Sequence, residues 1–197
     1  YISLGALNDT VKAVKVDGAE ATVDNVKAGA YKLSRPFNIA TKGEPTGLAK
    51  DFINFILSKE GQAVVTDNKY IAVNDAAESF VSDGSSGQIA VGGSSSVSPV
   101  MEKLIEAYKS VNPNASIDLQ TSDSTSGMTG AIDGTFAIGM ASRELKDEET
   151  AELTGTAIAL DGIAVVVNPA NTVEDLTMDQ IKGIYTGEIT DWSEVAA

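Results

Sequence analysis

Three short polar clusters contain the residue types that could bind an anion. They are Gly92-Gly93-Ser94-Ser95-Ser96-Val97, Ser124-Thr125-Ser126-Gly127 and Ala141-Ser142-Arg143. Serine and threonine hydroxyls rotate to donate hydrogen bonds, and glycine lets the backbone approach a ligand closely. Each cluster follows an expected strand and lies at or near the start of an expected helix, where unpaired N–H groups carry about half a positive charge. Arg143 would add a charge-assisted partner.

Such clusters also have an ordinary structural role. A single Ser/Gly cluster before a helix is usually a cap and a turn, and an Arg beside a carboxylate, as in Arg143-Glu144, is usually a surface ion pair. Three clusters at equivalent places in the chain favour a ligand instead, because ligands of open α/β sheets bind beyond the carboxyl ends of the strands. The pattern therefore predicts an oxyanion site.

The composition argues against catalysis. The 197 residues include no histidine and no cysteine, which excludes Ser-His-Asp and Cys-His arrangements and the usual zinc ligands. We find no GxSxG, SxxK, P-loop, GxGxxG or EF-hand spacing. The 28 Asp and Glu residues leave a carboxylate pair open, but nothing singles out one pair. We expect a binding protein, with no catalytic residue, metal or cofactor, and the net charge of −14 would repel nucleic acid.

The elements that must position these clusters form two blocks. In the first, residues 1–73, we expect strands at 11–16, 21–23, 36–40 and 70–73 and a helix at 47–67. In the second, residues 89–197, we expect strands at 89–92, 115–119, 136–140 and 156–167 and helices at 98–110, 125–133 and 177–185. Ser98 is expected to cap the helix at 98–110, and Thr125-Ser126 to cap the helix at 125–133. Strands alternating with helices predict an α/β fold, with a mixed, mostly parallel sheet covered by helices on both faces.

The joint between the blocks, residues 74–88, is rich in Ser, Gly and Asp and predicts a flexible connector. The apolar runs are far shorter than the roughly 20 residues of a membrane helix. The sequence opens without a basic and then apolar leader, so we expect it to start in mid-protein or after processing.

Long stretches resemble a known family. Residues 89–104, 131–134, 138–145, 159–165 and 184–192 look like the opening of the phosphate-binding protein of bacterial ABC transporters (PstS-like, periplasmic-binding-protein type II) in its Gram-positive form. Residues 1–7, 34–37 and 42–49 are similar to the final third of that family. The family's middle, which includes a Ser-Gly-Thr-Arg phosphate loop, has no counterpart here.

The resemblance implies one lobe of a two-lobed protein, with the two half-sequences in reversed order. Residues 1–73 and 89–197 would complete a common sheet, joined by residues 74–88, and the second lobe is absent. A natural permutation, an engineered one and the seam between tandem copies all remain open.

Carried over residue by residue, the resemblance implies phosphate contacts from Ser95, Ser96, Thr125, Ser126 and Ser142, with Arg143 as a cation. Many members have an aspartate where Ser142 stands, which accepts the proton that phosphate carries and sulfate lacks. In this sequence Asp161 or Asp123 would have to accept it.

The function implied is phosphate binding in an extracytoplasmic receptor, a cell-surface lipoprotein in its parent protein, that serves an ABC-transporter permease. One alternative is a receptor lobe for another oxyanion such as sulfate or molybdate. Another is an interaction module that self-associates through the exposed lobe face or pairs with a separate second lobe.

Overall fold

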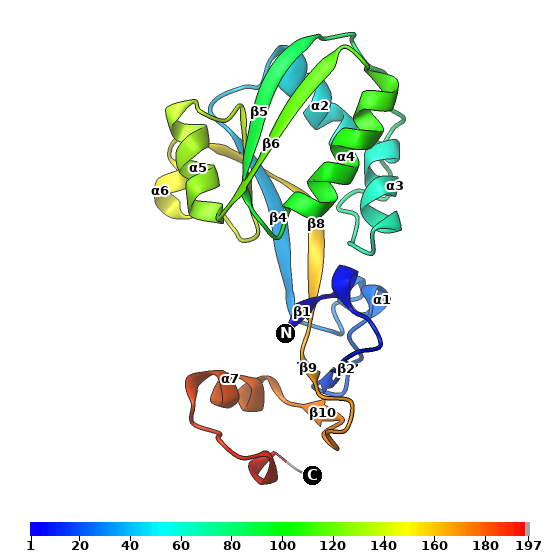
Figure 1. The fold of residues 1–197 in the computed structure, drawn as a ribbon, viewed down its shortest axis with the longest axis vertical. Helices are drawn as coiled ribbons and strands as arrows, with labels where there is room; N and C mark the ends of the chain where they lie inside the picture. Colours follow the sequence, from blue (N-terminus) through cyan, green and yellow to red (C-terminus); the bar gives the residue numbers. More distant parts are fainter. Residues whose placement is uncertain (196–197) are drawn as a thin grey trace. The chain divides into compact units, whose positions relative to one another are not determined.

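A computed structural model describes residues 1–195, which form two compact units (Figure 1). The large unit is Arg35–Leu160. The small unit combines Tyr1–Ser34 with the chain from Asp161 onward.

A six-stranded sheet in the order β1-β8-β4-β7-β5-β6 contains strands from both sequence blocks, as predicted. Strand β5 pairs in parallel with β6 and β7, whereas β4 is antiparallel to β7, so the sheet is mixed. The strands are β1 (Ile2–Ser3), β4 (Ser34–Thr41), β5 (Gly87–Ser94), β6 (Ala115–Ser122), β7 (Ile138–Ala141) and β8 (Thr154–Ala164).

Both faces of the sheet are covered in the large unit, because successive strand residues enter different cores. Ile39 of β4 and Met140 of β7 pack with α2 (Gly47–Leu57), α3 (Lys59–Asp67) and α4 (Ser98–Val111). Their neighbours Ala40 and Ala141 pack on the other face with α5 (Ser124–Asp133). Figure 1 shows α2, α3 and α4 on one side and α5 with α6 (Asp147–Thr150) on the other. The predicted α/β fold with helices on both faces is confirmed.

The single helix expected at 47–67 is wrong, because the chain bends at Ser58. Ser58 is extended (φ −74°, ψ 169°), and its hydroxyl accepts a hydrogen bond from the Gly61 N–H at 3.2 Å, which starts α3. A Cβ on Gly61 would lie 2.1 Å from the Phe55 carbonyl oxygen, so only glycine fits this corner. The strand expected at 70–73 is reduced to one bridge between Ile71 and Leu160.

The small unit is built from short elements. Strands β2 (Lys12–Ala13) and β9 (Val166–Val167) pair antiparallel, and β3 (Lys15–Val16) and β10 (Asp175–Leu176) pair in parallel. Helix α7 (Met178–Thr186) begins at a capping box formed by Thr177 and Gln180. The strand expected at 21–23 is wrong, because Thr22 caps the helix α1 (Val23–Lys27). Two 3-10 turns, η1 (Leu4–Ala6) and η2 (Trp192–Glu194), complete the unit.

The connector is held by the large unit along much of its length. The buried carboxylate of Asp51 on α2 accepts hydrogen bonds from the Ser82 hydroxyl (2.8 Å) and the Asp83 N–H (3.0 Å). The Phe80 ring packs against Phe55 at 5.3 Å between centroids. Strand β5 then begins at Gly87, two residues earlier than expected. Among the helices that the structure describes, none combines the length and apolar composition needed to cross a bilayer.

Candidate anion-binding site

The three polar clusters lie at the carboxyl ends of three neighbouring strands, which form one edge of the sheet. Strands β5, β6 and β7 are parallel neighbours, and their carboxyl ends are Ser94, Ser122 and Ala141. In the register, Ser94 stands opposite Ser122, and Gly93 stands opposite Met140. The edge is therefore the one at which α/β proteins bind ligands.

Close backbone packing brings the start of α5 to strands β5 and β7. A Cβ on Gly127 would lie 2.6 Å from the Met140 carbonyl oxygen and 2.7 Å from the Gly93 Cα. Gly93 itself has φ of 133°, a conformation that other residues rarely adopt. These glycines allow the helix start, with its hydroxyl-bearing residues, to approach the ends of β5 and β7.

The cap of α5 differs from the prediction. Asp123, not Thr125-Ser126, is the N-cap, and its carboxylate accepts the N–H groups of Thr125 (2.8 Å) and Ser126 (3.0 Å). The Ser126 hydroxyl donates to the same carboxylate at 2.6 Å, and this bond is the main reason why the pKa of Asp123 is lowered. A carboxylate therefore already occupies two amide donors of this helix start. The sequence reasoning missed that aspartate is as good a cap as serine.

A backbone hydrogen bond joins the second and third clusters. The Ser142 N–H donates to the Ser124 hydroxyl at 3.1 Å, so these residues are in direct contact. Ser124 is half-buried and was left out of the predicted contacts, although it stands in the predicted cluster. Because its oxygen already accepts a hydrogen bond, the hydroxyl hydrogen is free to point at a ligand.

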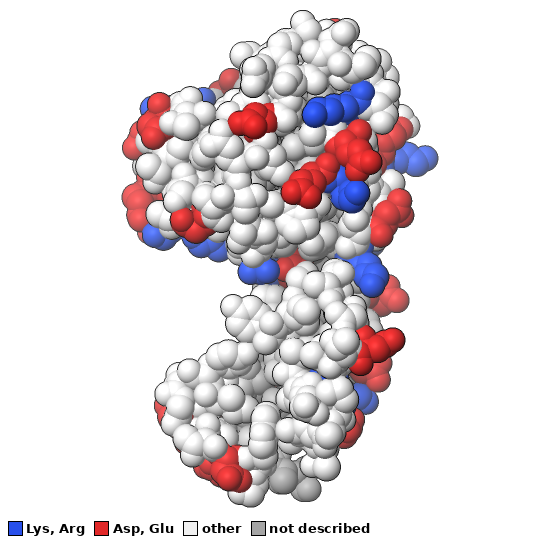
Figure 2. Space-filling model, in the orientation of Figure 1, with Lys and Arg blue, Asp and Glu red and all other residues white. Residues whose placement is uncertain are grey.

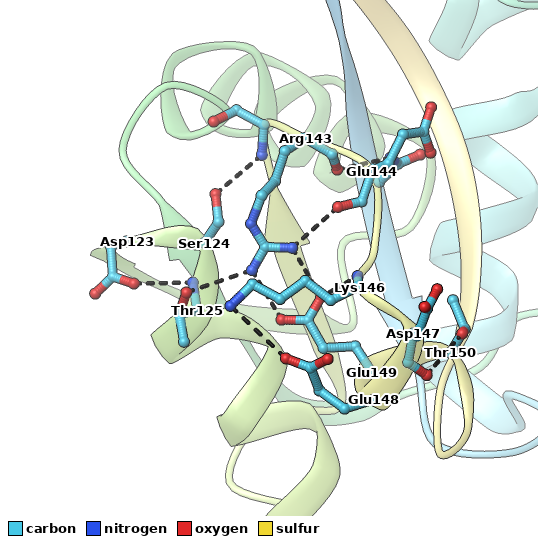
Figure 3. A network of polar contacts seen from close by, with 12 residues as sticks. Asp123, Ser124, Thr125, Arg143, Glu144, Lys146, Asp147, Glu148, Glu149 and Thr150 are labelled. Atoms are coloured by element: carbon cyan, nitrogen blue, oxygen red, sulfur yellow. Dashed lines mark hydrogen bonds and ion pairs between the residues drawn. The ribbon is translucent and has the colours of Figure 1, made fainter.

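Arg143 is held by an acidic partner that the sequence reasoning did not identify (Figure 3). Its guanidinium makes two hydrogen bonds of 2.8 Å to the Glu149 carboxylate, whereas adjacent Glu144 contributes only its backbone carbonyl at 3.0 Å. A further bond of 3.3 Å reaches the Thr125 hydroxyl oxygen. The ion pair raises the pKa of Arg143 and lowers that of Glu149. Arg143 is therefore next to the clusters, but its charge is already matched.

Ser95 and Ser96 complete the group in the large unit. The Ser95 N–H donates to the Ser122 carbonyl at 2.9 Å, which fixes the turn between β5 and α4. Ser95 is exposed and Ser96 half-buried, and no hydrogen-bond partner for their hydroxyls occurs within residues 1–195. Ser98, predicted as a cap, is instead the first residue of α4, where it is buried and its hydroxyl donates to the Ser94 carbonyl at 3.2 Å.

Asp161, the seventh predicted residue, belongs to the small unit. It is buried, and its carboxylate accepts a hydrogen bond from the Ser3 hydroxyl at 2.5 Å. Six of the seven predicted residues thus share the large unit and lie on the loops and helix starts at one sheet edge.

The donors at this edge are mostly uncharged. On the face drawn in Figure 2, Lys and Arg side chains are scattered among Asp and Glu without a continuous basic patch. An anion at this edge would be met by hydroxyls, a neutralised guanidinium and the ionised carboxylate of Asp123. Such a set can bind an oxyanion without a net positive charge.

Comparison with known proteins agrees with this geometry. Residues 79–197 match a family model described as a PBP superfamily domain. The phosphate-binding protein PstS 2 of Streptococcus agalactiae serotype V is 54% identical over 198 residues, which is all of this chain and 67% of that protein. PstS 2 of Streptococcus pneumoniae serotype 4 is 47% identical over 195 residues, again 67% of its length.

Solved structures give the same result. A phosphate-binding protein of a phosphate ABC transporter from Streptococcus pneumoniae TIGR4 superposes with a TM-score of 0.89, covering 99% of this chain and 76% of that one at 47% identity. A substrate-binding protein from Clostridium perfringens with bound phosphate has a TM-score of 0.52, covering 55% of this chain and 45% of that one at 46% identity. The chain therefore belongs to the PstS-type phosphate-binding proteins of the PBP superfamily.

Proposed function

We propose that this chain binds inorganic phosphate as the substrate-binding component of an ABC transporter, at the carboxyl ends of β5, β6 and β7. The observation that carries the proposal is the meeting of three hydroxyl-bearing clusters at the edge of three parallel strands. Relatives named phosphate-binding proteins, at up to 54% identity, support the ligand. This is a binding function, and no step of it is catalysis.

The proposed contacts are hydroxyls, in addition to the neutralised guanidinium of Arg143. To the predicted set we add Ser124, because its hydroxyl is oriented by the Ser142 N–H. Asp123 stays a candidate acceptor for the phosphate proton, whereas Asp161 belongs to the small unit, where it accepts the Ser3 hydroxyl. The residues proposed to contact phosphate are Ser95, Ser96, Ser124, Thr125, Ser126, Ser142 and Arg143.

We also propose that the chain represents one lobe. Residues 1–73 would correspond to the C-terminal third of the family and residues 89–197 to its N-terminal part, with residues 74–88 joining the two blocks. The shared six-stranded sheet supports this assignment. Alignment of the whole chain with PstS 2 supports a natural origin for the block order. The relatives' remaining third would then supply the facing lobe, and the parent protein would work outside the cytoplasm beside its permease.

Phosphate titration of the chain, followed by amide chemical shifts, tests the proposal. One lobe leaves a bound anion half hydrated, so we expect a Kd of about 1 mM or weaker, which corresponds to about −4 kcal/mol. Thr125→Val should weaken binding roughly fivefold, because one hydrogen bond contributes about 1 kcal/mol. The matched control is Thr129→Val, an exposed threonine on the same helix.

Two results would contradict the proposal. Absence of binding at 50-fold or so above this Kd would exclude phosphate as a ligand of the chain, and equal weakening by both variants would move the site elsewhere. Sulfate or molybdate binding more tightly than phosphate across the pH range would instead support the alternative oxyanion receptor.

A further inference from the structure

Glu149 is a buried carboxylate for which the proposed phosphate contacts give no role. It lies on α6 and is 5% exposed. Its oxygens accept the two bonds from Arg143 and a third, of 2.8 Å, from the Lys146 N–H. The carboxylate is thus fixed on the backbone of its own helix start and fixes the guanidinium in turn.

The guanidinium of Arg143 connects Glu149 to the proposed anion site. With Arg143 anchored on Glu149, the second N–H of its Nη2 donates to the Thr125 hydroxyl oxygen. Because that oxygen accepts a hydrogen bond, the Thr125 hydroxyl hydrogen is free to donate to a ligand. The chain of contacts from Glu149 to Arg143 to Thr125 is visible in Figure 3.

Cancellation of the charge has a second consequence, for specificity. At about 6 Å in water, a free guanidinium would strengthen binding of a monoanion roughly threefold and of a dianion roughly tenfold. A cation paired at 2.8 Å with a carboxylate gives much less of this advantage. The charge of Arg143 then contributes little to how the site ranks anions.

We propose that Glu149 is a positioning residue that sets the anion preference of the site, by orienting Arg143 toward Thr125 and cancelling its charge. The inference rests on the proposed phosphate site. Its consequence is that divalent sulfate gains little over singly charged, protonated phosphate. A lobe lacking the carboxylate would favour the dianion.

The test compares phosphate and sulfate affinities of the chain and of Glu149→Gln near pH 5. There inorganic phosphate is mainly a monoanion and sulfate a dianion, and the lowered pKa of Glu149 keeps its carboxylate ionised. We expect the variant to gain about threefold in phosphate affinity and about tenfold in sulfate affinity, so that the phosphate-to-sulfate ratio falls about threefold. The matched control is Glu148→Gln, which removes the same charge from an exposed neighbour paired with Lys146 at 3.8 Å, and should leave the ratio unchanged.

The double variant Arg143→Gln/Glu149→Gln removes both charges and should restore the original ratio, although both affinities fall. If Glu149 only supports the fold, Glu149→Gln will weaken both anions by the same factor, and that outcome overturns the inference while leaving the phosphate site intact. If the unmodified chain binds no phosphate, the proposed function and the inference both fall. A measurement on the unmodified chain needs no variant to fold: a tenfold rise in ionic strength screens the net charge of −14 and should not weaken sulfate more than phosphate, so a much steeper loss for sulfate contradicts charge cancellation.

Discussion

The buried cluster around Asp51 allows a sharp prediction about stability. Asp51 is 2% exposed, and its carboxylate has hydrogen-bond donors but no ion-pair partner among residues 1–195. The Tyr108 hydroxyl donates to it at 2.6 Å and also accepts a bond of 3.0 Å from the Asn112 side chain. The cluster therefore joins α2, α4 and the connector, through bonds that neutral groups donate to a buried charge.

Tyr108→Phe removes one of these donors and keeps the ring. The Tyr108 ring packs on Phe52 and Phe55, at 5.0 and 5.4 Å between centroids, and phenylalanine preserves both contacts. Asp51 keeps its bonds from Ser82 and Asp83. A hydrogen bond to a charged group contributes about 1.5–3 kcal/mol, so we expect the free energy of unfolding to fall by about 2 kcal/mol. For a chain of this size the Tm should drop by roughly 4–8 °C.

Urea denaturation followed by far-ultraviolet circular dichroism measures this change. Tyr185→Phe is the control, because Tyr185 is 60% exposed and the same oxygen is removed. It should change the unfolding free energy by less than about 0.5 kcal/mol. Equal effects of the two substitutions would refute the reasoning, since the buried bond would then contribute no more than a surface one.

The same cluster predicts a pH dependence with a definite sign. Burial raises the pKa of Asp51, but the hydrogen bonds from Tyr108, Asp83, Ser82 and Asn112 outweigh it and hold the pKa below the ordinary 3.8. A lowered native pKa means that the stabilisation is complete above about pH 4 and is lost as pH falls through the native pKa. The difference between the unmodified chain and Tyr108→Phe should be constant from neutral pH to about pH 5 and shrink in stronger acid. A difference that grows on acidification would contradict this assignment.

Two further substitutions probe the packing of each unit. In thermal denaturation, Gly127→Ala should destabilise the large unit by about 1–3 kcal/mol, because the added Cβ would meet Met140 and Gly93. The control Thr129→Ala, on the exposed face of α5, should be nearly neutral in the same assay. Tyr31→Phe should destabilise the small unit by about 1 kcal/mol, because the hydroxyl of the buried Tyr31 donates a hydrogen bond to the Ile163 carbonyl at 2.8 Å. Trp192 lies in the same unit, so its fluorescence measures the unfolding of that unit. An unchanged denaturation midpoint for Gly127→Ala or Tyr31→Phe would contradict that prediction, because the structure would then accommodate the substitution without losing stability.

Local signals in the sequence were enough to predict most of the large unit. The start of α4 at Ser98-Pro99 and the polar clusters behind β5, β6 and β7 follow from periodicity and turn chemistry, which act within a few residues. The break at Ser58 also had a local signal, a serine three residues before Gly61, but the continuous apolar face concealed it. The Asp51 cluster had none, because its partners lie 31 to 61 residues away in the chain.

The partner of Arg143 was missed for a different reason. Glu149 stands at the third position of α6, where a capping box places a Glu, but Lys146 occupies the cap position that normally identifies the motif. The sequence therefore suggested Glu144, which is adjacent in the chain, and the fold selected the residue whose carboxylate faces the guanidinium. Arg143 lies at a bend after β7, so proximity along the chain was a poor guide to its partner.

The net negative charge of the chain limits which groups can attract an anion to the proposed site. A chain with a net charge of −14 repels anions at long range, so an anion must be attracted by groups that act only at contact. Hydroxyls oriented by backbone N–H groups and by a paired guanidinium satisfy this requirement, because each offers a hydrogen atom and no net charge. Their contribution depends on water being excluded, which the proposed single lobe would do only in part. On that proposal, weak binding by this chain and tighter binding by a closed pair of lobes would be two results of one set of donors.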